Sequence, residues 1–137
     1  AYVTDFPTAE TVGQPGMVTI PHLGASTAES EDNCAVMCAR ELREYLENGN
    51  IKNSVNFPNA SMPHSGEHRI CVLHHNIPST LSQISSALAE QGINISNMLN
   101  RSKKEYAYTI VEISGDIPTQ SVDAIRRIEG VCRVNLY

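Results

Sequence analysis

In the second half of the chain, segments with the hydrophobic pattern of a strand and segments with that of a helix follow one another in a definite order. This order constrains the fold more than any other feature of the sequence. Consecutive or alternating apolar residues are typical of strands, whereas apolar residues three and four positions apart are typical of helices. Two segments have the helical pattern: Pro78 begins the first, and Gly92 and Gly130 follow the ends of the first and the second. The predicted elements are a strand at 69–75, a helix at 78–91, strands at 93–99 and 106–113, a helix at 118–129 and a strand at 131–137.

This order predicts an α+β domain with the ferredoxin-like β-α-β-β-α-β arrangement, in which both helices cover one face of an antiparallel sheet. The other face, or an edge strand, is then expected to need a partner. Unrelated functions share this arrangement, so the fold alone does not identify what the chain does. Function has to be inferred from particular residues.

The first half of the chain predicts one long helix followed by an irregular segment. Ser26 and Glu29 have the spacing of a capping box, and Gly49 is a good C-terminal cap, so we expect a helix over 27–48. Asn, Ser and Pro dominate residues 50–66, which predicts a linker or an extended segment. The apolar stripe of the helix comprises Cys34, Met37, Cys38, Leu42, Tyr45 and Leu46.

The net charge of −5 and the pI near 5.5 argue against nucleic-acid binding, which requires a clustered basic surface. No apolar run reaches the roughly 20 residues that a membrane-spanning helix needs, and no signal peptide is recognisable, so we expect a cytoplasmic protein. Thiols stay reduced in that compartment, and the four cysteines are expected to be reduced and mostly buried. Their spacing does not match a zinc site.

His22 follows a short strand predicted at 17–20, and another short, buried strand is predicted at 1–6. A histidine in the loop after a strand can act as a general acid or base near neutral pH. The alternative is a surface histidine in a turn. Asp5 and Glu10 are candidate partners only because they are near in sequence. No glycine-rich nucleotide loop occurs in the chain.

His74, His75 and Asn76 lie where the first strand of the second half meets a helix. The free N–H groups at a helix start favour the carboxylate of a small zwitterion. A metal site is less expected, because neighbouring histidines on a strand point to opposite faces. Asn94, at the start of the next strand, can approach the surface of another copy. A ligand site and a structural turn are the two alternatives for this segment.

Two stretches, and the order in which they occur, resemble one family. Residues 21–27, Pro-His-Leu-Gly-Ala-Ser-Thr, resemble the catalytic-histidine motif of the D-isomer-specific 2-hydroxyacid dehydrogenases. Residues 47–58 resemble the segment that joins that enzyme core to a regulatory domain, and residues 67–137 resemble the ACT domain, an amino-acid sensor. The resemblance is to the members that oxidise 3-phosphoglycerate with NAD, the first step of L-serine synthesis, many of which are inhibited by L-serine.

The resemblance implies four parts: a remnant of the nucleotide-binding domain at 1–25, a core-crossing helix at 26–49, a linker at 50–66 and a regulatory ACT domain at 67–137. It implies a C-terminal portion of an NAD-dependent oxidoreductase. The nucleotide loop, the substrate-binding Arg and the Glu that pairs with the catalytic His are then expected before residue 1. The chain alone is therefore expected to bind no NAD and to be inactive.

The same resemblance assigns roles to individual residues. His22 matches the catalytic acid/base and is expected to lack a partner carboxylate in this chain. His74 and Asn76 match the loop that holds L-serine, and Asn94 matches a residue supplied by the neighbouring subunit. L-serine is then expected between two ACT domains that dimerise. No metal site is implied.

Ser79 departs from the family pattern, because a Gly often follows the proline of this loop. The departure favours an alternative function, in which the domain only assembles dimers and binds no effector. A hinge is expected near Ser65 and Gly66, ahead of the domain. Cys71 and Cys132 are expected to fill the core.

Overall fold

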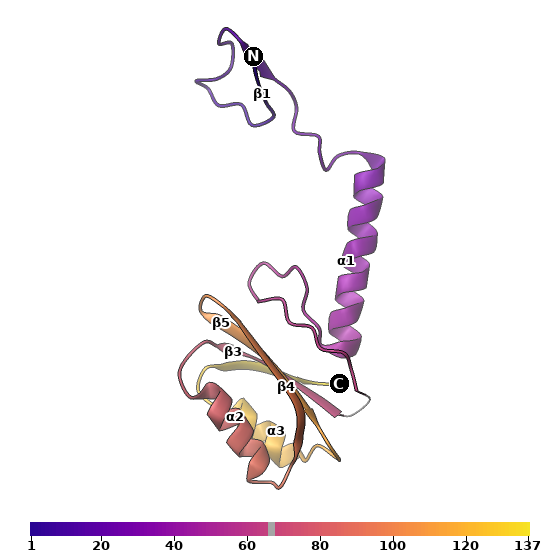
Figure 1. Ribbon diagram of the computed structural model, residues 1–137, viewed down its shortest axis with the longest axis vertical. Coiled ribbons are helices and arrows are strands. Elements are labelled where there is room, and N and C mark those ends of the chain that lie inside the picture. The colour runs from indigo at the N-terminus through magenta and orange to yellow at the C-terminus, as the bar shows by residue number, and fades with distance from the viewer. Residues whose placement is uncertain (66–67) are drawn as a thin grey trace. The chain divides into compact units, whose positions relative to one another are not determined.

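Two units, residues 1–39 and 40–137, make up the computed structural model, which describes residues 1–65 and 68–137 (Figure 1). Gly66 of the predicted hinge and the predicted domain boundary between residues 66 and 67 lie outside the described residues. The division into four parts therefore stays a prediction.

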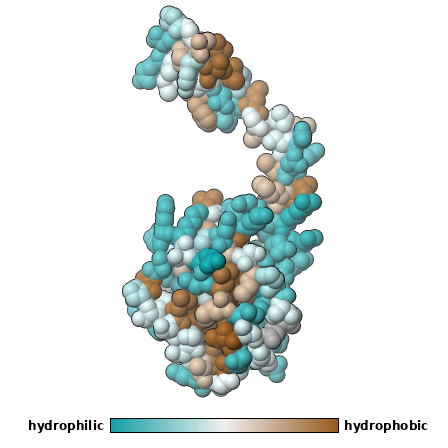
Figure 2. Space-filling view, in the orientation of Figure 1, coloured by the Kyte–Doolittle hydropathy of each residue, from teal (hydrophilic) through white to brown (hydrophobic). Residues whose placement is uncertain are grey.

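A pair of three-residue strands forms the sheet of the first unit. β1 (Tyr2–Thr4) and β2 (Met17–Thr19) run parallel, with Tyr2 opposite Met17. The prediction that the first strand is buried is wrong, because Tyr2 and Val3 expose 62% and 59% of their surface. Figure 2 shows apolar side chains, in brown, on the surface of this unit. A two-stranded sheet without a second layer cannot bury such side chains.

The predicted long helix is α1 (Ala28–Asn48), and its existence is confirmed. Its N-terminal cap is Thr27, whose Oγ1 accepts a hydrogen bond from Ser30 N at 3.2 Å. The predicted capping box of Ser26 and Glu29 is therefore wrong by one residue. α1 contains no buried residue. Its exposed large apolar side chains are Val36, Met37, Leu42 and Leu46.

The second unit has the predicted β-α-β-β-α-β order, which the structure confirms. Its elements are β3 (His68–His75), α2 (Thr80–Ala89), β4 (Ile95–Lys103), β5 (Tyr106–Ile113), α3 (Thr119–Arg126) and β6 (Val131–Leu136). The strands pair antiparallel in the order β4-β5-β3-β6, so β4 and β6 are the edges of the sheet. α2 and α3 lie on the same face of this sheet (Figure 1).

Alternate residues of the central strands point to two separate cores. The larger core lies between the sheet and the two helices. Each fully buried aliphatic side chain there contributes about 1.5–3 kcal/mol to folding. The members of this core are Ile70, Val72, Ile84, Leu88, Val111, Ile113, Val122, Ile125 and Val134. The two helices contribute Ile84 and Leu88 of α2 and Val122 and Ile125 of α3, all of which are buried.

Residues 49–63, which we call the arm, cover the opposite face of the sheet. The arm folds back on itself through a backbone pair between Ile51 and Ala60, and both residues are buried. They pack in a second core with Cys71, Leu73, Tyr108 and Ile110. The prediction that this face needs a partner is wrong where the arm covers it. The segment predicted as a linker thus packs on the sheet.

A buried ion pair joins the arm to the sheet. Arg69 of β3 and Glu112 of β5 lie opposite each other, both side chains are fully buried, and Arg69 Nη2 lies 2.5 Å from Glu112 Oε1. The guanidinium also donates to the backbone oxygens of Asn48, Met62 and Pro63, at 2.7, 3.0 and 2.9 Å. These oxygens flank or belong to the two ends of the arm. One side chain therefore holds both ends against the sheet.

The carboxylate of Glu112 has further donors. It accepts hydrogen bonds from Ser65 N at 3.1 Å and from Asn97 Nδ2 of β4 at 3.1 Å. Burial raises the pKa of Glu112, but the hydrogen bonds from Arg69, Ser65 and Asn97 outweigh it and lower the pKa from 4.5 to about 2. The carboxylate is therefore ionised over the whole neutral and mildly acidic range.

The cysteines differ from their prediction in burial. Cys71 is buried, whereas Cys34, Cys38 and Cys132 are exposed, and all four are free thiols. The prediction of mostly buried thiols is wrong, and so is that of Cys132 as a core residue. Burial raises the pKa of the Cys71 thiol to about 11, so this thiol is neutral at pH 7.

None of the helices in the described residues combines the length and the apolar character that crossing a membrane requires.

Gly49→Ala is expected to destabilise the second unit. Gly49, the predicted C-terminal cap of α1, has a φ of +70°, and a Cβ there would lie 2.5 Å from Cys71 Sγ and 2.8 Å from Tyr137 Cε2. We expect a loss of about 2–4 kcal/mol, from the left-handed backbone and from overpacking. Gly92→Ala is the matched control, because Gly92 has a φ of +71° and no described atom within 4 Å of its would-be Cβ. Urea unfolding of both variants checks this, and equal losses would contradict the close packing.

Glu112→Gln is expected to lower the free energy of unfolding by about 3–5 kcal/mol at pH 7, because it leaves the buried Arg69 without its counter-charge. The pKa of Glu112 is about 2 in the folded chain, below its ordinary 4.5. The stability that the ionised carboxylate contributes is therefore complete above about pH 4.5 and is lost as the pH falls toward 2. The difference between wild type and variant should shrink over the same interval.

The control for this measurement is Asp123→Asn, which breaks the half-exposed pair of Asp123 and Arg126. That change should cost less than about 1 kcal/mol. Urea unfolding of the three proteins at several pH values measures both effects. A constant difference between wild type and Glu112→Gln down to acid pH would argue against the lowered pKa.

Candidate functional site

His22 and Asp5 form a pair in the first unit. They lie just beyond the ends of the parallel strands β2 and β1, and such ends meet at one edge of a sheet. His22 Nδ1 lies 2.7 Å from Asp5 Oδ2, and the ring of Phe6 contacts the imidazole with a centroid distance of 4.3 Å. The expectation that His22 lacks a partner carboxylate is therefore wrong.

This geometry determines what His22 can do. A carboxylate at Nδ1 favours the tautomer with its proton on Nδ1, which leaves Nε2 free to accept a proton. A base oriented by a carboxylate in this way is a common catalytic arrangement. The side chains of His22 and Asp5 expose 52% and 42% of their surface, so solvent reaches the pair. The catalytic role that the resemblance assigns to His22 stays a prediction.

His74 lies near the end of β3 and exposes 2% of its surface. Its Nε2 lies 2.9 Å from Thr109 Oγ1, which lies 2.9 Å from Asn100 Oδ1. Its Nδ1 lies 2.8 Å from the backbone oxygen of His75. These hydrogen bonds join β3, β5 and β4 and fix the position of the imidazole.

Asn76 is exposed in the turn between β3 and α2. Its backbone N donates to Glu105 O at 2.8 Å, and its Nδ2 donates to Lys104 O at 3.3 Å. Residues 104–105 form the tight turn between β4 and β5. The turn that carries His74 and Asn76 is therefore held by the tip of this hairpin.

The hairpin tip also contacts the arm. Tyr106 packs against His75 and against Phe57 of the arm, with ring-centroid distances of 5.1 and 5.4 Å. Lys103 Nζ donates to the backbone oxygens of residues 54 and 55, both at 3.1 Å. The tip thus connects the arm with the candidate ligand turn.

Ser79 adopts a left-handed backbone conformation, with a φ of +69°. Glycine takes this conformation at low cost, whereas a residue with a Cβ is strained. Ser79 O nevertheless accepts a hydrogen bond from Gln83 N at 2.9 Å, which forms the first turn of α2. The departure from glycine therefore leaves the turn intact. The N–H groups of residues 80–82 precede this bond and have no acceptor within the helix.

Asn94 lies at the opposite end of the sheet from His74 and Asn76. Its backbone oxygen accepts a hydrogen bond from Ser114 N at 3.2 Å, whereas His74 lies opposite Ala107. The stretch from Ala107 to Ser114 corresponds to roughly 23 Å along β5. One chain therefore brings His74 and Asn76 together and keeps Asn94 away from them.

Thr109, Asn100 and Tyr106 hold the candidate turn in place, and none of them was predicted from the sequence. They become visible once the strand register is known, because Thr109 lies opposite both Val72 and Asn100. The tight turn at 104–105 is the sequence signal that could have given this register. Among the described residues, no group of three His, Cys, Asp or Glu side chains could hold a metal ion.

Comparison with curated proteins finds D-3-phosphoglycerate dehydrogenases. The chain is 32% identical over 118 residues to the D-3-phosphoglycerate dehydrogenase of Escherichia coli (strain K12), a match that covers 85% of this chain and 29% of that protein. It is 32% identical over 112 residues to D-3-phosphoglycerate dehydrogenase 1 of Saccharomyces cerevisiae, covering 78% of this chain and 24% of that protein. The chain thus spans less than a third of the length of these relatives. No protein-family model matches it.

Solved structures similar to the chain include ACT domains. The ACT domain from GTP pyrophosphokinase of Chlorobium tepidum has a TM-score of 0.46 and 16% identity, and the match covers 51% of this chain and 95% of that one. An ACT domain protein from Streptococcus pneumoniae has a TM-score of 0.43 and 20% identity, with 51% and 85% covered.

Ser79→Gly is expected to stabilise the second unit by about 1 kcal/mol, because glycine removes the strain of the left-handed backbone. Ser82→Gly is the matched control: Ser82 is exposed inside α2, where glycine should cost about 1 kcal/mol. Urea unfolding of the two variants should give changes of opposite sign. A destabilised Ser79→Gly would contradict the strained turn.

Proposed function

The chain is a sequence relative of the D-3-phosphoglycerate dehydrogenases, and we propose that it is the C-terminal regulatory portion of such an NAD-dependent enzyme. Two copies pair through their ACT domains, and L-serine binds where they meet. L-serine is then a feedback inhibitor of the first step of its own synthesis, in the cytoplasm. The observation that carries this proposal is the separation of Asn94 from His74 and Asn76 within one chain.

Pairing of two β4 edges would bring these residues together. β4 is an edge strand, so its outer side has backbone groups free to pair with a second copy. When two β4 strands pair antiparallel around a two-fold axis, the Asn94 end of one lies beside the Lys103 end of the other. Lys103 adjoins the hairpin tip that holds Asn76. A dimer of this kind has two equal sites, each with Asn76 from one copy and Asn94 from the other.

The groups at such a site match a small amino acid. The N–H groups of residues 80–82 and the dipole of α2 favour a carboxylate. The side-chain amides of Asn76 and Asn94 offer both donors and acceptors for an ammonium and a hydroxyl group. His74 is the positioning residue of the turn, because both its ring nitrogens are bonded within the chain. Bound L-serine ties two domains together and thereby favours one arrangement of the attached enzyme cores.

The bonding of His74 also favours a second candidate function. A histidine whose ring nitrogens are both occupied inside the protein has no free donor or acceptor for a ligand. In this alternative the domain only assembles dimers and binds no effector.

For the catalytic portion we propose that His22 is the acid/base and that Asp5 orients it. NAD, bound by the whole enzyme, supplies the acceptor for the hydride of 3-phosphoglycerate. The 137 residues contain no glycine-rich nucleotide loop, so their contribution to the reaction is this proton-transfer pair. The isolated chain is therefore proposed to be inactive.

L-serine titrated calorimetrically into the chain should bind at one site per copy, and D-serine should not. Asn76→Ala and Asn94→Ala should each weaken binding by at least about tenfold, since each removes a polar contact at a desolvated site. Mixed in equal amounts and allowed to exchange, the two variants should regain binding. In a mixed dimer one of the two sites then contains both asparagines.

Asn33→Ala, an exposed change on α1, is the control and should bind as wild type does. Sedimentation first establishes that each protein is dimeric. A wild-type dimer that gives no heat with L-serine would exclude the effector role and support the assembly-only alternative. A mixture that exchanges subunits without regaining binding would exclude a site shared in this way.

A further inference from the structure

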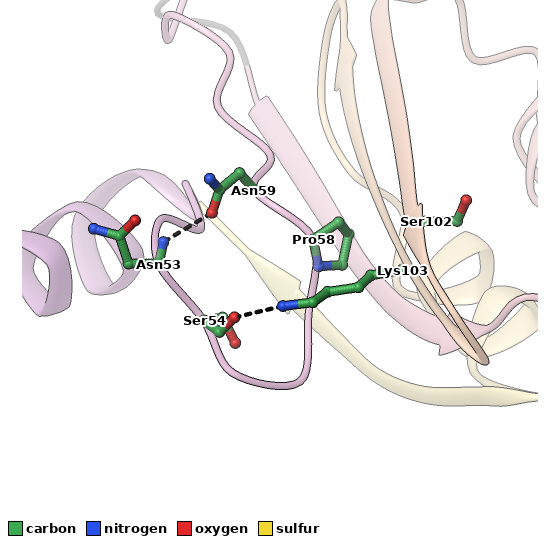
Figure 3. Close-up of a pocket in the computed structure, with 6 residues that line it drawn as sticks. All are labelled: Asn53, Ser54, Pro58, Asn59, Ser102 and Lys103. Atoms are coloured by element: carbon green, nitrogen blue, oxygen red, sulfur yellow. Dashed lines mark hydrogen bonds between the residues drawn. The ribbon is translucent and has the colours of Figure 1, made fainter. Parts of the chain in front are cut away.

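An open pocket of about 540 Å³ lies between the arm and the end of β4 (Figure 3). Its lining residues are Asn53, Ser54, Pro58, Asn59, Ser102 and Lys103. Figure 3 shows the Lys103 side chain reaching from β4 toward Ser54 of the arm. The pocket is thus built from two segments that are about fifty residues apart in sequence.

The charge of this pocket is not balanced. Lys103 Nζ donates to the backbone oxygens of residues 54 and 55, and an ammonium has a third N–H. Within the described residues no carboxylate forms an ion pair with Lys103, and no lining residue is acidic. Glu41 Oε1 accepts a hydrogen bond from Asn53 Nδ2 at 2.5 Å, but Glu41 itself does not line the pocket.

The neutral lining groups also present donors. Asn59 Oδ1 accepts a hydrogen bond from Asn53 N at 2.8 Å, so the amide is oriented with its NH₂ group available. Ser54 Oγ accepts from Phe57 N at 3.1 Å and keeps its own O–H to donate. One cation and two neutral donors therefore line a pocket that has no acidic residue in its lining.

We propose that this pocket binds a phosphate group, either free or carried by a small ester. Several anionic oxygens on one ligand match the several donors, and charge-assisted hydrogen bonds are the stronger kind. The volume is within the range of small-molecule sites. The proposal does not rest on serine binding. Because the donors come from both the arm and β4, a bound phosphate group would strengthen the contact between them.

Titration of the chain with inorganic phosphate, followed in proton–nitrogen correlation spectra at constant ionic strength, tests the proposal. The amide signals of residues 53–59 and 102–104 should shift and saturate, with a dissociation constant on the order of 1 mM. Glycerol phosphate, titrated in the same way, distinguishes the two sources. Tighter binding than inorganic phosphate assigns the site to an ester, and equal or weaker binding assigns it to free phosphate. Glycerol alone should cause no shift.

Two variants with matched controls locate the site. Lys103→Met should abolish saturable binding, whereas Lys52→Met, which removes the same charge outside the pocket lining, should not. Asn59→Asp keeps an acceptor for Asn53 N but adds a negative charge, and it should weaken binding about fivefold. Gln83→Glu, on the exposed side of α2, adds the same charge and should have no effect.

Asn59→Asp decides the question if Lys103→Met releases the arm or fails to fold. Shifts of wild type that never saturate would overturn the proposal. So would binding that is unchanged in Asn59→Asp.

Discussion

The second unit depends on the buried pair of Arg69 and Glu112. Two fully buried charges are costly unless their hydrogen-bonding capacity is satisfied, and the guanidinium alone presents five N–H groups. The arm supplies backbone oxygens to those groups, at Met62 and Pro63 among others, while the neighbouring strand supplies Asn97 to the carboxylate. The pair and the arm therefore stabilise each other. This explains how a segment rich in Asn, Ser and Pro takes a single packed path over the sheet.

Because the arm is packed on the sheet, the hairpin tip between β4 and β5 contacts both the arm and the turn at Asn76. One side of this tip holds the turn at Asn76, and the other side is joined to the arm through Lys103 and Phe57. A ligand at the turn and a phosphate group at the arm would then act on the same few residues. The tip is a short structural connection between the candidate effector site and the segment that leads back to α1.

The candidate sites also show what one chain supplies and what it does not. The carboxylate that contacts His22 is that of Asp5, which belongs to the same unit. The effector site that we propose requires a second copy, because Asn94 lies about the length of a strand away from His74. Edge strand β4 offers a symmetric way to complete it. The strained backbone of Ser79 costs stability and keeps the shape of the turn.

The sequence by itself determined the order of helices and strands, the cap at Gly49 and the identity of the candidate residues. Hydrophobic period, Pro and Gly positions and short motifs are local properties, which neighbouring residues determine among themselves. Only the tertiary structure decided that Asp5 meets His22, that the arm covers the sheet and that Asn94 lies far from His74. These outcomes depend on contacts between residues far apart in the chain, and the hydrophobic periods that predict single helices and strands do not specify such contacts.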